Sequence, residues 1–499
     1  MAAMAAVDLG AQSGRVALGA FDGERLSVEE VHRFPNVPVL AGGRLSWDIL
    51  RLYEDILDGL TAAGLVADVD SVGIDTWGVD FGLLDRQGRL VQNPVHHRDR
   101  RTDGVMDTLF AEVPAREIYE RTGVQLMPIN TLVQLYAAVQ SEDAALDIAN
   151  RLLLIPDLLN YWLCGVIACE YTNATTTQCL DAGTREWATD LLERLRIPTR
   201  LFTEVVRPAT VVDALLDEVA DRTRLRRAVV AVPATHDTAS AVAAVPVRSP
   251  SAVYISAGTW ALVGLELREA LIDDRSLRAN LTNEGGIDGT VRLLRNVNGF
   301  WLVEESRRWW ASQGRSLEIG ELLESAAEAP PLRSLVDPDA PELLRPGPLP
   351  ELIQAHCRRT EQPVPEEPGA VVRCILESLA LKFRRTIDLL ASVAGVRPPE
   401  VHIVGGGARN RLLCQWTADA TGLPVLAGPE EATVVGNLLA QAIALGEIKS
   451  LEQGREVVRA SFALVAYEPA DQDAWDEAYG RFEELLSSHT TAAPEAVAP

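Results

Sequence analysis

The chain has 499 residues, more than one hydrophobic core usually supports, so its length predicts two domains. Hydrophobic residues make up 47 % of the sequence, which excludes a largely disordered chain. The 46 basic and 71 acidic residues give a formal net charge of −25, which repels nucleic acid and anionic lipid, so we expect neither as a partner.

The N-terminus and the cysteines both bear on the cellular compartment. The first residues, Met-Ala-Ala-Met-Ala-Ala, lack the basic segment of a secretory signal, and no apolar run reaches the length of a membrane span. We therefore predict a soluble cytoplasmic protein, with its oligomeric state left open. The six cysteines form no Cys-x-x-Cys pair and no zinc-like cluster, so we expect free thiols, with a Cys357–Cys374 bridge as the alternative.

A strand, a tight turn and a second strand are predicted at the start of the chain, over residues 5–21. Short apolar runs bounded by Gly and Ser, closed by an Asp-Gly turn, are typical of a β-hairpin. The same pattern recurs at residues 71–84 and 252–265, and the first and last copies lie about half the chain apart. These repeats predict an α/β protein with two similarly built domains, residues 1–241 and 242–486, and a flexible tail at 487–499.

Helical spacing of apolar residues follows these hairpins in several places. The expected helices cover residues 47–60, 129–140, 371–390 and 470–486. Residues 330–350 are rich in Pro and Asp and are predicted to form a loop.

The first hairpin turn is a candidate phosphate site. A Walker-type loop is absent, because the only lysines, Lys382 and Lys449, follow no Gly-rich segment. The turn over residues 8–15 offers another solution, in which backbone N–H groups form a concave anion site. Gly10 and Gly14 allow close backbone approach, Ser13 and Arg15 add donors, and Asp8 is a candidate Mg²⁺ ligand. The turn at residues 256–259 would supply a second such site, although either turn alone is equally typical of an ordinary hairpin.

A third glycine-rich turn, Gly405-Gly406-Gly407, follows the apolar run that begins at Val401. Three glycines between a strand and a helix permit a flat ligand such as adenine to lie against bare backbone, and the next helix N-terminus favours negative charge.

The stretch Val232–Val242, near the middle of the chain, holds Asp237 between His236 and Thr238. A carboxylate after a buried strand is where a phosphoryl-transfer enzyme would place a base for a substrate hydroxyl. The same residue is also typical of a helix N-cap, and this stretch taken alone favours the N-cap over the base.

Two aromatic features have simpler interpretations. Trp77 is equally compatible with stacking on a sugar and with a place in the core. His96 and His97 are predicted to form a solvated pair on a loop, because no carboxylate or thiol is spaced to bind a metal with them.

Taken together, these motifs resemble the FGGY carbohydrate kinases, and within that family the rhamnulokinase branch. The resemblance covers roughly residues 5–440 and is carried by segments 7–15, 73–80, 170–178, 235–242, 280–286 and 404–407. Asp-Thr-Trp-Gly and Glu-Tyr-Thr-Asn-Ala-Thr-Thr-Thr-Gln are specific to the branch, whereas the glycine turns belong to the wider actin-like ATPase superfamily. The resemblance implies two RNase H-like domains facing across a cleft.

It also implies transfer of a phosphoryl group from ATP, with Mg²⁺, to the C1 hydroxyl of the ketose L-rhamnulose. Asp237 would be the proton acceptor and Asp8 the metal ligand. The implied sugar-site residues are Gly78, His236, Thr238 and Asn296. The implied ATP-site residues are Ala11, Gln12, Ser13, Gly14, Arg15, Thr259, Glu304 and Gly406.

The sequence departs from the family pattern at two positions. His97 stands where an aromatic residue often precedes the Arg-Asp pair, and Glu304 stands where glutamine is more usual.

Two rival functions remain. One is phosphorylation of another ketose, such as L-fuculose or a xylulose. The other is an actin-like ATPase without sugar kinase activity, which the His236-Asp237-Thr238 cluster and Asn296 disfavour. The fold alone would not disfavour it, because one fold serves many functions.

Overall fold

The computed structural model describes the backbone of residues 2–490 and the side chains of residues 2–487. The chain divides into two compact units. The first unit runs to Pro246 and also includes Glu266–Leu293 and Glu431–Phe462; the second comprises Val247–Leu265, Leu294–Glu430 and the chain from Ala463 onward. The expected boundary at residue 242 lies near the first passage, but two later segments return to the first unit. Such returns depend on tertiary packing, which leaves no local signal.

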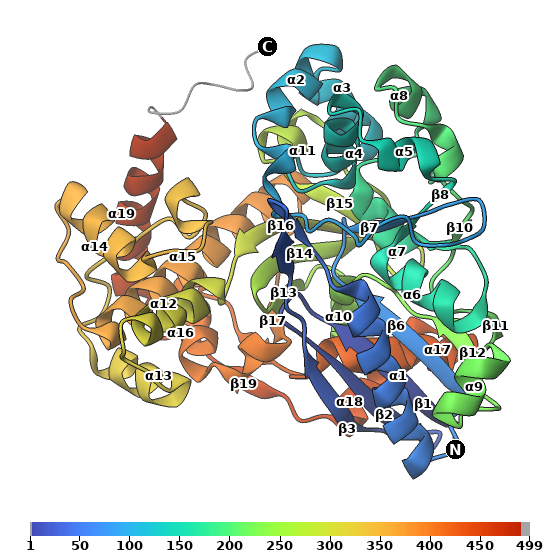
Figure 1. The fold of residues 1–499 in the computed structure, drawn as a ribbon. Coiled ribbons are helices and arrows are strands. Elements are labelled where there is room, and N and C mark those ends of the chain that lie inside the picture. The colour runs from blue at the N-terminus through green and yellow to red at the C-terminus, as the bar shows by residue number, and fades with distance from the viewer. Residues whose placement is uncertain (1, 491–499) are drawn as a thin grey trace. The chain divides into compact units, whose positions relative to one another are not determined.

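A six-stranded sheet forms the centre of the first unit, in the order β11-β12-β6-β1-β2-β3 (Figure 1). β1 pairs antiparallel with β2 and parallel with β6, and β6 pairs parallel with β12. The strands are β1 (Ala2–Leu9), β2 (Ser13–Phe21), β3 (Leu26–Pro35), β6 (Ser71–Thr76), β11 (Thr210–Ala214) and β12 (Val229–Val232).

Helices cover both faces of this sheet. Val16 faces α1 (Ile49–Val66), where an added Cβ on Gly59 would lie 2.3 Å from it. Three residues further along β2, on the opposite face, Gly19 approaches Leu438 of α17 (Ala432–Ala444). Side chains buried between the sheet and α1 include Val7, Val72 and Ile74. Also in this unit are α6 (Ile155–Cys164), α9 (Asp217–Thr223), α10 (Asp237–Ala243), α11 (Asp274–Arg278), α18 (Leu451–Ser461) and the small hairpin of β4 (Val39–Ala41) and β5 (Arg44–Ser46).

A second hydrophobic cluster lies within the first unit, built mainly from residues 81–202. Its elements are β7 (Phe81–Leu84), η1 (Arg100–Thr102), α2 (Val105–Glu112), α3 (Ala115–Thr122), α4 (Thr131–Gln140), α5 (Ala144–Ile148), β8 (Arg151–Leu154), β9 (Cys169–Glu170), α7 (Tyr171–Ala174), η2 (Thr175–Thr177), α8 (Thr189–Arg194), η3 (Thr199–Leu201) and β10 (Val205–Val206). The hairpin predicted over residues 71–84 is wrong. β1 and β12 occupy both edges of β6, so β7 pairs with β8 instead.

The other large sheet has the order β15-β16-β14-β13-β17-β18-β19. Its strands are β13 (Val253–Ala257), β14 (Trp260–Leu267), β15 (Thr282–Gly285), β16 (Val291–Asn298), β17 (Val401–Val404), β18 (Val425–Ala427) and β19 (Val465–Tyr467). The helices of the second unit are α12 (Trp301–Ser312), α13 (Ile319–Glu328), η4 (Pro341–Leu343), α14 (Leu349–Arg359), α15 (Pro368–Ala394), η5 (Gly406–Arg409), α16 (Arg411–Thr421) and α19 (Gln472–Thr490).

The two sheets share a topology. β13 pairs antiparallel with β14 and parallel with β17, as β1 does with β2 and β6. β17 then pairs parallel with β18, and β18 antiparallel with the edge strand β19, matching β6, β12 and β11. The predicted α/β class with two similarly built domains is therefore confirmed.

The expected helices are present as α1, α4, α15 and α19. α19 continues four residues past the expected end at Leu486, to Thr490, and the rest of the predicted tail lies outside the described residues. Residues 330–350 form a loop except for η4 and the start of α14. All six cysteines are buried free thiols, including Cys357 and Cys374, as expected.

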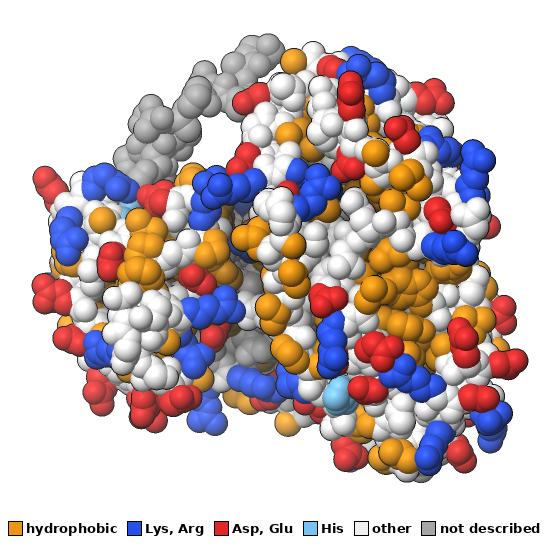
Figure 2. All heavy atoms as spheres, in the orientation of Figure 1, with side chains coloured by type: hydrophobic (Ala, Val, Ile, Leu, Met, Phe, Trp, Pro, Cys, Tyr) orange, Lys and Arg blue, Asp and Glu red, His pale blue; other side chains and the backbone are white. Residues whose placement is uncertain are grey.

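The surface is charged with both signs. On the face drawn in Figure 2, Lys and Arg side chains are interspersed with Asp and Glu. Among the residues that the structure describes, no helix is both long and apolar enough to span a bilayer.

Candidate active site

Three carboxylates gather at one edge of the sheet in the first unit. Asp8 on β1 lies directly opposite Asp75 on β6 in the parallel ladder. The end of β6 continues this ladder, because Thr76 bridges to His236, which follows β12 and precedes Asp237. Parallel strands end at the same edge, so Asp8, Asp75 and Asp237 come together there, and Asp75 feels the charges of both others.

The first carboxylate is fixed by an arginine across the β1–β2 turn. Nε and Nη2 of Arg15 donate to Oδ2 of Asp8 at 2.9 and 2.7 Å. Nη1 of the same arginine donates to Glu431, just before α17. Burial alone would lower the pKa of Arg15, but the charges of Asp8 and Glu431 raise it above its usual value. The guanidinium therefore stays charged beside Asp8.

Asp75 is completely buried and only partly satisfied. Its Oδ2 accepts from Nδ2 of Asn437 at 2.6 Å, while Oδ1 is a buried oxygen without a hydrogen-bond partner. Burial raises the pKa of Asp75 well above its usual value, and the charge of Asp8 raises it further, against the hydrogen bond from Asn437. A bound proton or a cation would satisfy this oxygen. Sequence reasoning missed Asp75 as a site residue, although it ends a buried strand as Asp8 does.

Asp237 is the first residue of α10, and His236 occupies the N-cap position without a side-chain capping bond. The N-cap alternative for Asp237 is therefore wrong: the backbone turns helical at this residue, so its carboxylate accepts from the next N–H, that of Thr238, at 2.6 Å. The side chain remains 29 % exposed. Even so, desolvation raises the pKa of Asp237, opposed by His236 and by the Thr238 hydrogen bonds.

A buried glutamate, Glu170, holds the loop that carries these residues. Glu170 accepts hydrogen bonds from the backbone N–H and hydroxyl of Thr235 at 3.0 and 2.8 Å. It also accepts from the N–H and hydroxyl of Thr172 at 2.8 and 2.6 Å and from the N–H of Asn173 at 3.3 Å. Because Thr235 precedes His236, this network fixes the position from which α10 begins.

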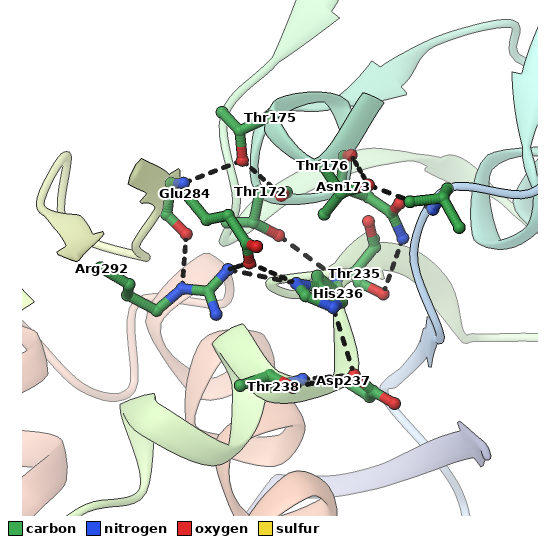
Figure 3. Close-up of polar contacts among 12 residues, drawn as sticks. Thr172, Asn173, Thr175, Thr176, Thr235, His236, Asp237, Thr238, Glu284 and Arg292 are labelled. Atoms are coloured by element: carbon green, nitrogen blue, oxygen red, sulfur yellow. Dashed lines mark hydrogen bonds and ion pairs between the residues drawn. The ribbon is translucent and has the colours of Figure 1, made fainter. Parts of the chain in front are cut away.

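A second charged network reaches His236 from β15 and β16 (Figure 3). The carboxylate of Glu284 accepts from Nη2 of Arg292 at 3.1 Å. Nδ1 of His236 lies 3.3 Å from Glu284 Oε2 and 3.1 Å from Arg292 Nη2. Burial alone would raise the pKa of Glu284, but the hydrogen bond with His236 and the charge of Arg292 lower it. Glu284 lies in a segment that carries the family resemblance; no local signal marks Arg292.

The turn between β1 and β2 holds residues 11–14. Asn36 donates two hydrogen bonds to this turn. Its backbone N–H donates to the carbonyl of Gln12 at 3.0 Å, and its Nδ2 donates to the carbonyl of Gly10 at 2.9 Å. Packing also favours glycine at position 14, because an added Cβ would lie 2.3 Å from the ring of Phe34.

Gly78 lies in a turn supported by the threonine-rich segment. An added Cβ on Gly78 would lie 2.8 Å from Oγ1 of Thr176, and the same hydroxyl accepts from the N–H of Val79 at 3.1 Å. Val79 has a left-handed φ of 66°, which bends the chain sharply after Gly78. Trp77 is buried in the core of the first unit, which supports the second of its two interpretations.

The interpretation of His96 and His97 as a solvated pair is wrong. Both are buried, and His96 stacks on Trp47 with ring centroids 4.1 Å apart. Nδ1 of His97 lies 2.8 Å from Oδ2 of Asp80, which also accepts from Nε1 of Trp47 at 2.7 Å. The carboxylate partner is 17 residues earlier in the chain, where spacing patterns for metal ligands give no signal. Donors already occupy this oxygen, so the cluster is a hydrogen-bonded core.

The remaining predicted residues lie in the second unit. The carbonyl of Thr259, in the β13–β14 turn, accepts from the N–H of Gly299, just before α12, at 3.2 Å. In the glycine turn after β17, an added Cβ on Gly407 would lie 3.0 Å from Phe300, whereas Gly406 is exposed with open space above its Cα. Glu304 on α12 pairs with Arg307 at 2.8 Å.

The structure thus brings the predicted residues together in two groups. Within the first unit, Asp8, Arg15, His236, Asp237 and Thr238 meet at the strand edge, with Ala11, Gln12, Ser13 and Gly14 in the adjoining turn and Gly78 beyond the end of β6. Within the second unit, the turns of Thr259 and Gly406 both pack against the start of α12, which carries Glu304, while Asn296 lies on β16.

Comparisons with known proteins show the family to which this fold belongs. The models of the N-terminal and C-terminal domains of the FGGY family of carbohydrate kinases match residues 3–244 and 253–445. The chain belongs to the FGGY family of carbohydrate kinases. Such a kinase transfers a phosphoryl group from ATP to a sugar, and a divalent metal generally accompanies the nucleotide.

Relatives lie within one branch of this family. The chain is 42 % identical over 483 residues to a rhamnulokinase of Bacteroides thetaiotaomicron, covering 96 % of this chain and 99 % of the relative. It is 40 % identical over 491 residues to a rhamnulokinase of Pectobacterium carotovorum, covering 97 % of each. The resemblance to this family, inferred from the motifs, is therefore confirmed.

Solved structures share the fold. A ligand-bound xylulose kinase of Lactobacillus acidophilus superposes with a TM-score of 0.81 at 14 % identity, over 98 % of this chain and 99 % of the other. A Plasmodium falciparum glycerol kinase with ADP has a TM-score of 0.76, also at 14 % identity, over 100 % of this chain and 99 % of the other.

Proposed function

We propose that this kinase transfers the γ-phosphoryl group of ATP to the C1 hydroxyl of L-rhamnulose, giving L-rhamnulose 1-phosphate. The sugar is supported by relatives about 40 % identical over nearly the whole chain, all bearing the name rhamnulokinase. The observation that carries the chemistry is Asp237, a partly exposed carboxylate beside the Asp8–Arg15 hairpin.

Asp237 would act as the base. The transition state of phosphoryl transfer is loose, so positioning and charge neutralisation dominate, and a base contributes about 10²–10⁴-fold. The carboxylate is held at the start of α10 by Thr238 and by the Glu170 network, with Nε2 of His236 at 3.5 Å from Oδ1. It would accept the proton of the C1 hydroxyl as that oxygen bonds to the γ-phosphorus and the bond to the bridging oxygen breaks, releasing ADP.

For the nucleotide we propose one set of residues within each unit. In the first unit, N–H groups and a guanidinium would point at phosphate oxygens. These groups belong to Ala11, Gln12, Ser13, Gly14 and Arg15. Gly406, with open space above it, would lie against adenine, with Thr259 and Glu304 completing the site.

The acidic strand edge fits Mg²⁺, because it offers carboxylate oxygens, including one that is buried and unpartnered on Asp75. Asp8 would hold the ion directly or through water, and the ion would neutralise charge that develops on the phosphate oxygens. Arg15 keeps the Asp8 carboxylate oriented for this role.

The sugar side is proposed to comprise His236, Thr238, Gly78 and Asn296. His236 and Thr238 flank the base, and the sharp turn after Gly78 leaves backbone that a ligand can approach. Polar groups at fixed positions discriminate among ketoses by the hydroxyls that each presents.

The test is an ADP-release assay over a panel of ketoses and polyols with MgATP. Asp237→Ala should lower kcat about 10²–10⁴-fold and change the affinity for ATP little. A matched control is Asp217→Ala, since Asp217 is likewise the first residue of a helix, α9, and should retain activity. Near wild-type turnover of Asp237→Ala would refute the base assignment.

The panel also tests the sugar. A clear preference for L-fuculose or a xylulose over L-rhamnulose would replace the proposed substrate and keep the family chemistry. ATP hydrolysis without stimulation by any sugar would favour the actin-like ATPase instead.

A further inference from the structure

The surroundings of His236 restrict which of its ring nitrogens carries hydrogen (Figure 3). Nδ1 faces a donor, Nη2 of Arg292, at 3.1 Å. Nε2 faces an acceptor, Oδ1 of Asp237, at 3.5 Å. A hydrogen on Nδ1 alone would point an N–H at a guanidinium N–H and a lone pair at a carboxylate. A hydrogen on Nε2 makes both contacts attractive.

The charged partner of Arg292 does not change this result. Oε2 of Glu284 lies 3.1 Å from Nη2 of Arg292 and 3.3 Å from Nδ1 of His236. If Glu284 draws a second proton onto Nδ1, the ring becomes an imidazolium, which still carries hydrogen on Nε2. Both protonation states compatible with these contacts therefore present an N–H to Asp237.

Burial of the Arg292 guanidinium costs desolvation free energy that packing alone does not explain. It is fully buried, and its Nη1 has no hydrogen-bond partner, so part of its desolvation is not offset. Its Nε donates to the carbonyl of Gly285 at 2.9 Å and its Nη2 to Glu284, which together fix the guanidinium plane beside the imidazole. The arrangement holds one donor aimed at Nδ1.

We propose that Arg292, anchored by Glu284, is a positioning residue that keeps hydrogen on Nε2 of His236, directed at Asp237. The inference rests on the proposed function only in taking Asp237 as the base. The N–H of His236 favours the charged form of Asp237, opposing burial and the charge of Asp8, which favour the neutral form. It would also hold the carboxylate in one orientation as the sugar hydroxyl approaches.

The direct test is the tautomer itself. With ¹⁵N-labelled histidine, two-bond ¹H–¹⁵N spectra distinguish protonated from unprotonated ring nitrogens, and the chain has only 7 histidines to assign, with His236→Gln identifying the signal. We expect hydrogen on Nε2 in the wild-type enzyme without ligands. Hydrogen on Nδ1 alone would overturn the proposal, whatever the activity.

A rescue experiment separates positioning from structure. Arg292→Met removes the donor, so hydrogen should move to Nδ1, facing Glu284, and kcat should fall about 10- to 100-fold with KM for ATP little changed. Adding Glu284→Gln to Arg292→Met supplies an amide donor to Nδ1 and should restore both the Nε2 hydrogen and most of kcat. A double variant no better than the single one would contradict the proposal.

Arg373 and Glu377 provide the matched control, since they form a buried Arg–Glu pair in the second unit with Nε to Oε1 at 2.7 Å. Arg373→Met should lower stability without moving the His236 hydrogen, and Glu377→Gln should not rescue it. If Arg292→Met does not fold, the wild-type spectrum still decides the tautomer. A wild-type enzyme that phosphorylates no ketose would refute the proposed function and leave that measurement valid.

Discussion

Replacing Asp75 by asparagine should make the protein more stable, increasingly so as the pH rises. Asp75 is fully buried, its Oδ1 lacks a partner, and burial together with the charge of Asp8 raises its pKa well above the ordinary value of 3.8. In the unfolded chain the group ionises near that ordinary value, whereas in the folded protein it keeps its proton to higher pH. Wild-type stability is therefore full at low pH and is lost as pH rises toward the folded pKa.

The size of the effect follows from the linkage of one proton. Between 3.8 and the folded pKa, the wild type should lose about 1.4 kcal/mol per pH unit that Asp75→Asn retains. The side-chain oxygen of the variant can still accept from Asn437, so the existing hydrogen bond is kept. Groups far from Asp75 titrate alike in the two proteins and cancel in the difference, which reports Asp75 together with the carboxylates whose charges it feels.

The assay is the melting temperature of wild type and Asp75→Asn by calorimetry from pH 5 to pH 8, without nucleotide or Mg²⁺. The control is Asp80→Asn, because the interaction with His97 holds the pKa of Asp80 below its usual value although burial alone would raise it. Because that titration lies below pH 5, the wild type should melt at a higher temperature than Asp80→Asn by a margin that stays constant from pH 5 to pH 8. A difference between wild type and Asp75→Asn that stays constant, or that grows toward acid pH, would refute the reasoning.

Two further substitutions test how α10 is held. Glu170→Gln leaves at least one of five donors facing an amide N–H, so we expect a loss of ~2–4 kcal/mol and a lower kcat as Thr235 shifts, measured by melting and ADP release. Asp181→Asn, which changes another buried carboxylate that accepts from backbone N–H groups, should keep its kcat. Gly436→Ala would place a Cβ 1.7 Å from the carbonyl oxygen of Ser240, so it should cost ~1–3 kcal/mol or more by overpacking α10 against α17, and an unchanged melting temperature would contradict the close contact.

Much of the fold was predictable because its signals are local. Apolar runs and glycine turns predict the β1–β2 and β13–β14 hairpins. The hairpins stand at corresponding places in the two halves of the chain, which predicts the repeated topology. Residues 71–84 have the same local sequence pattern but form no hairpin. Which strand pairs with β6 is decided by β1 and β12, which are far away in the chain.

The candidate site was predictable where side chains sit on recognisable turns. Asp237 and the Asp8–Arg15 hairpin follow from motifs, and the structure brings them to one edge. Arg292 could not be found this way, because its role comes from β16 passing beside His236. His96 and His97 were misjudged for the same reason, since their burial and their partner Asp80 depend on tertiary packing.

Three carboxylates at one strand edge would repel one another if their surroundings were alike, but the structure gives each a different environment. Asp8 is paired with Arg15, which orients its carboxylate for a cation. Asp75, buried and half-satisfied, has the raised pKa of a group that keeps its proton. Asp237 lies between these extremes, partly exposed, with desolvation and Asp8 favouring the neutral acid and His236 favouring the carboxylate. Environments that push neighbouring pKa values apart assign different tasks to identical side chains. Because His236, together with the hydrogen bonds of Thr238, opposes protonation of Asp237, the Arg292–Glu284 pair beside its ring helps to keep this carboxylate available as a base.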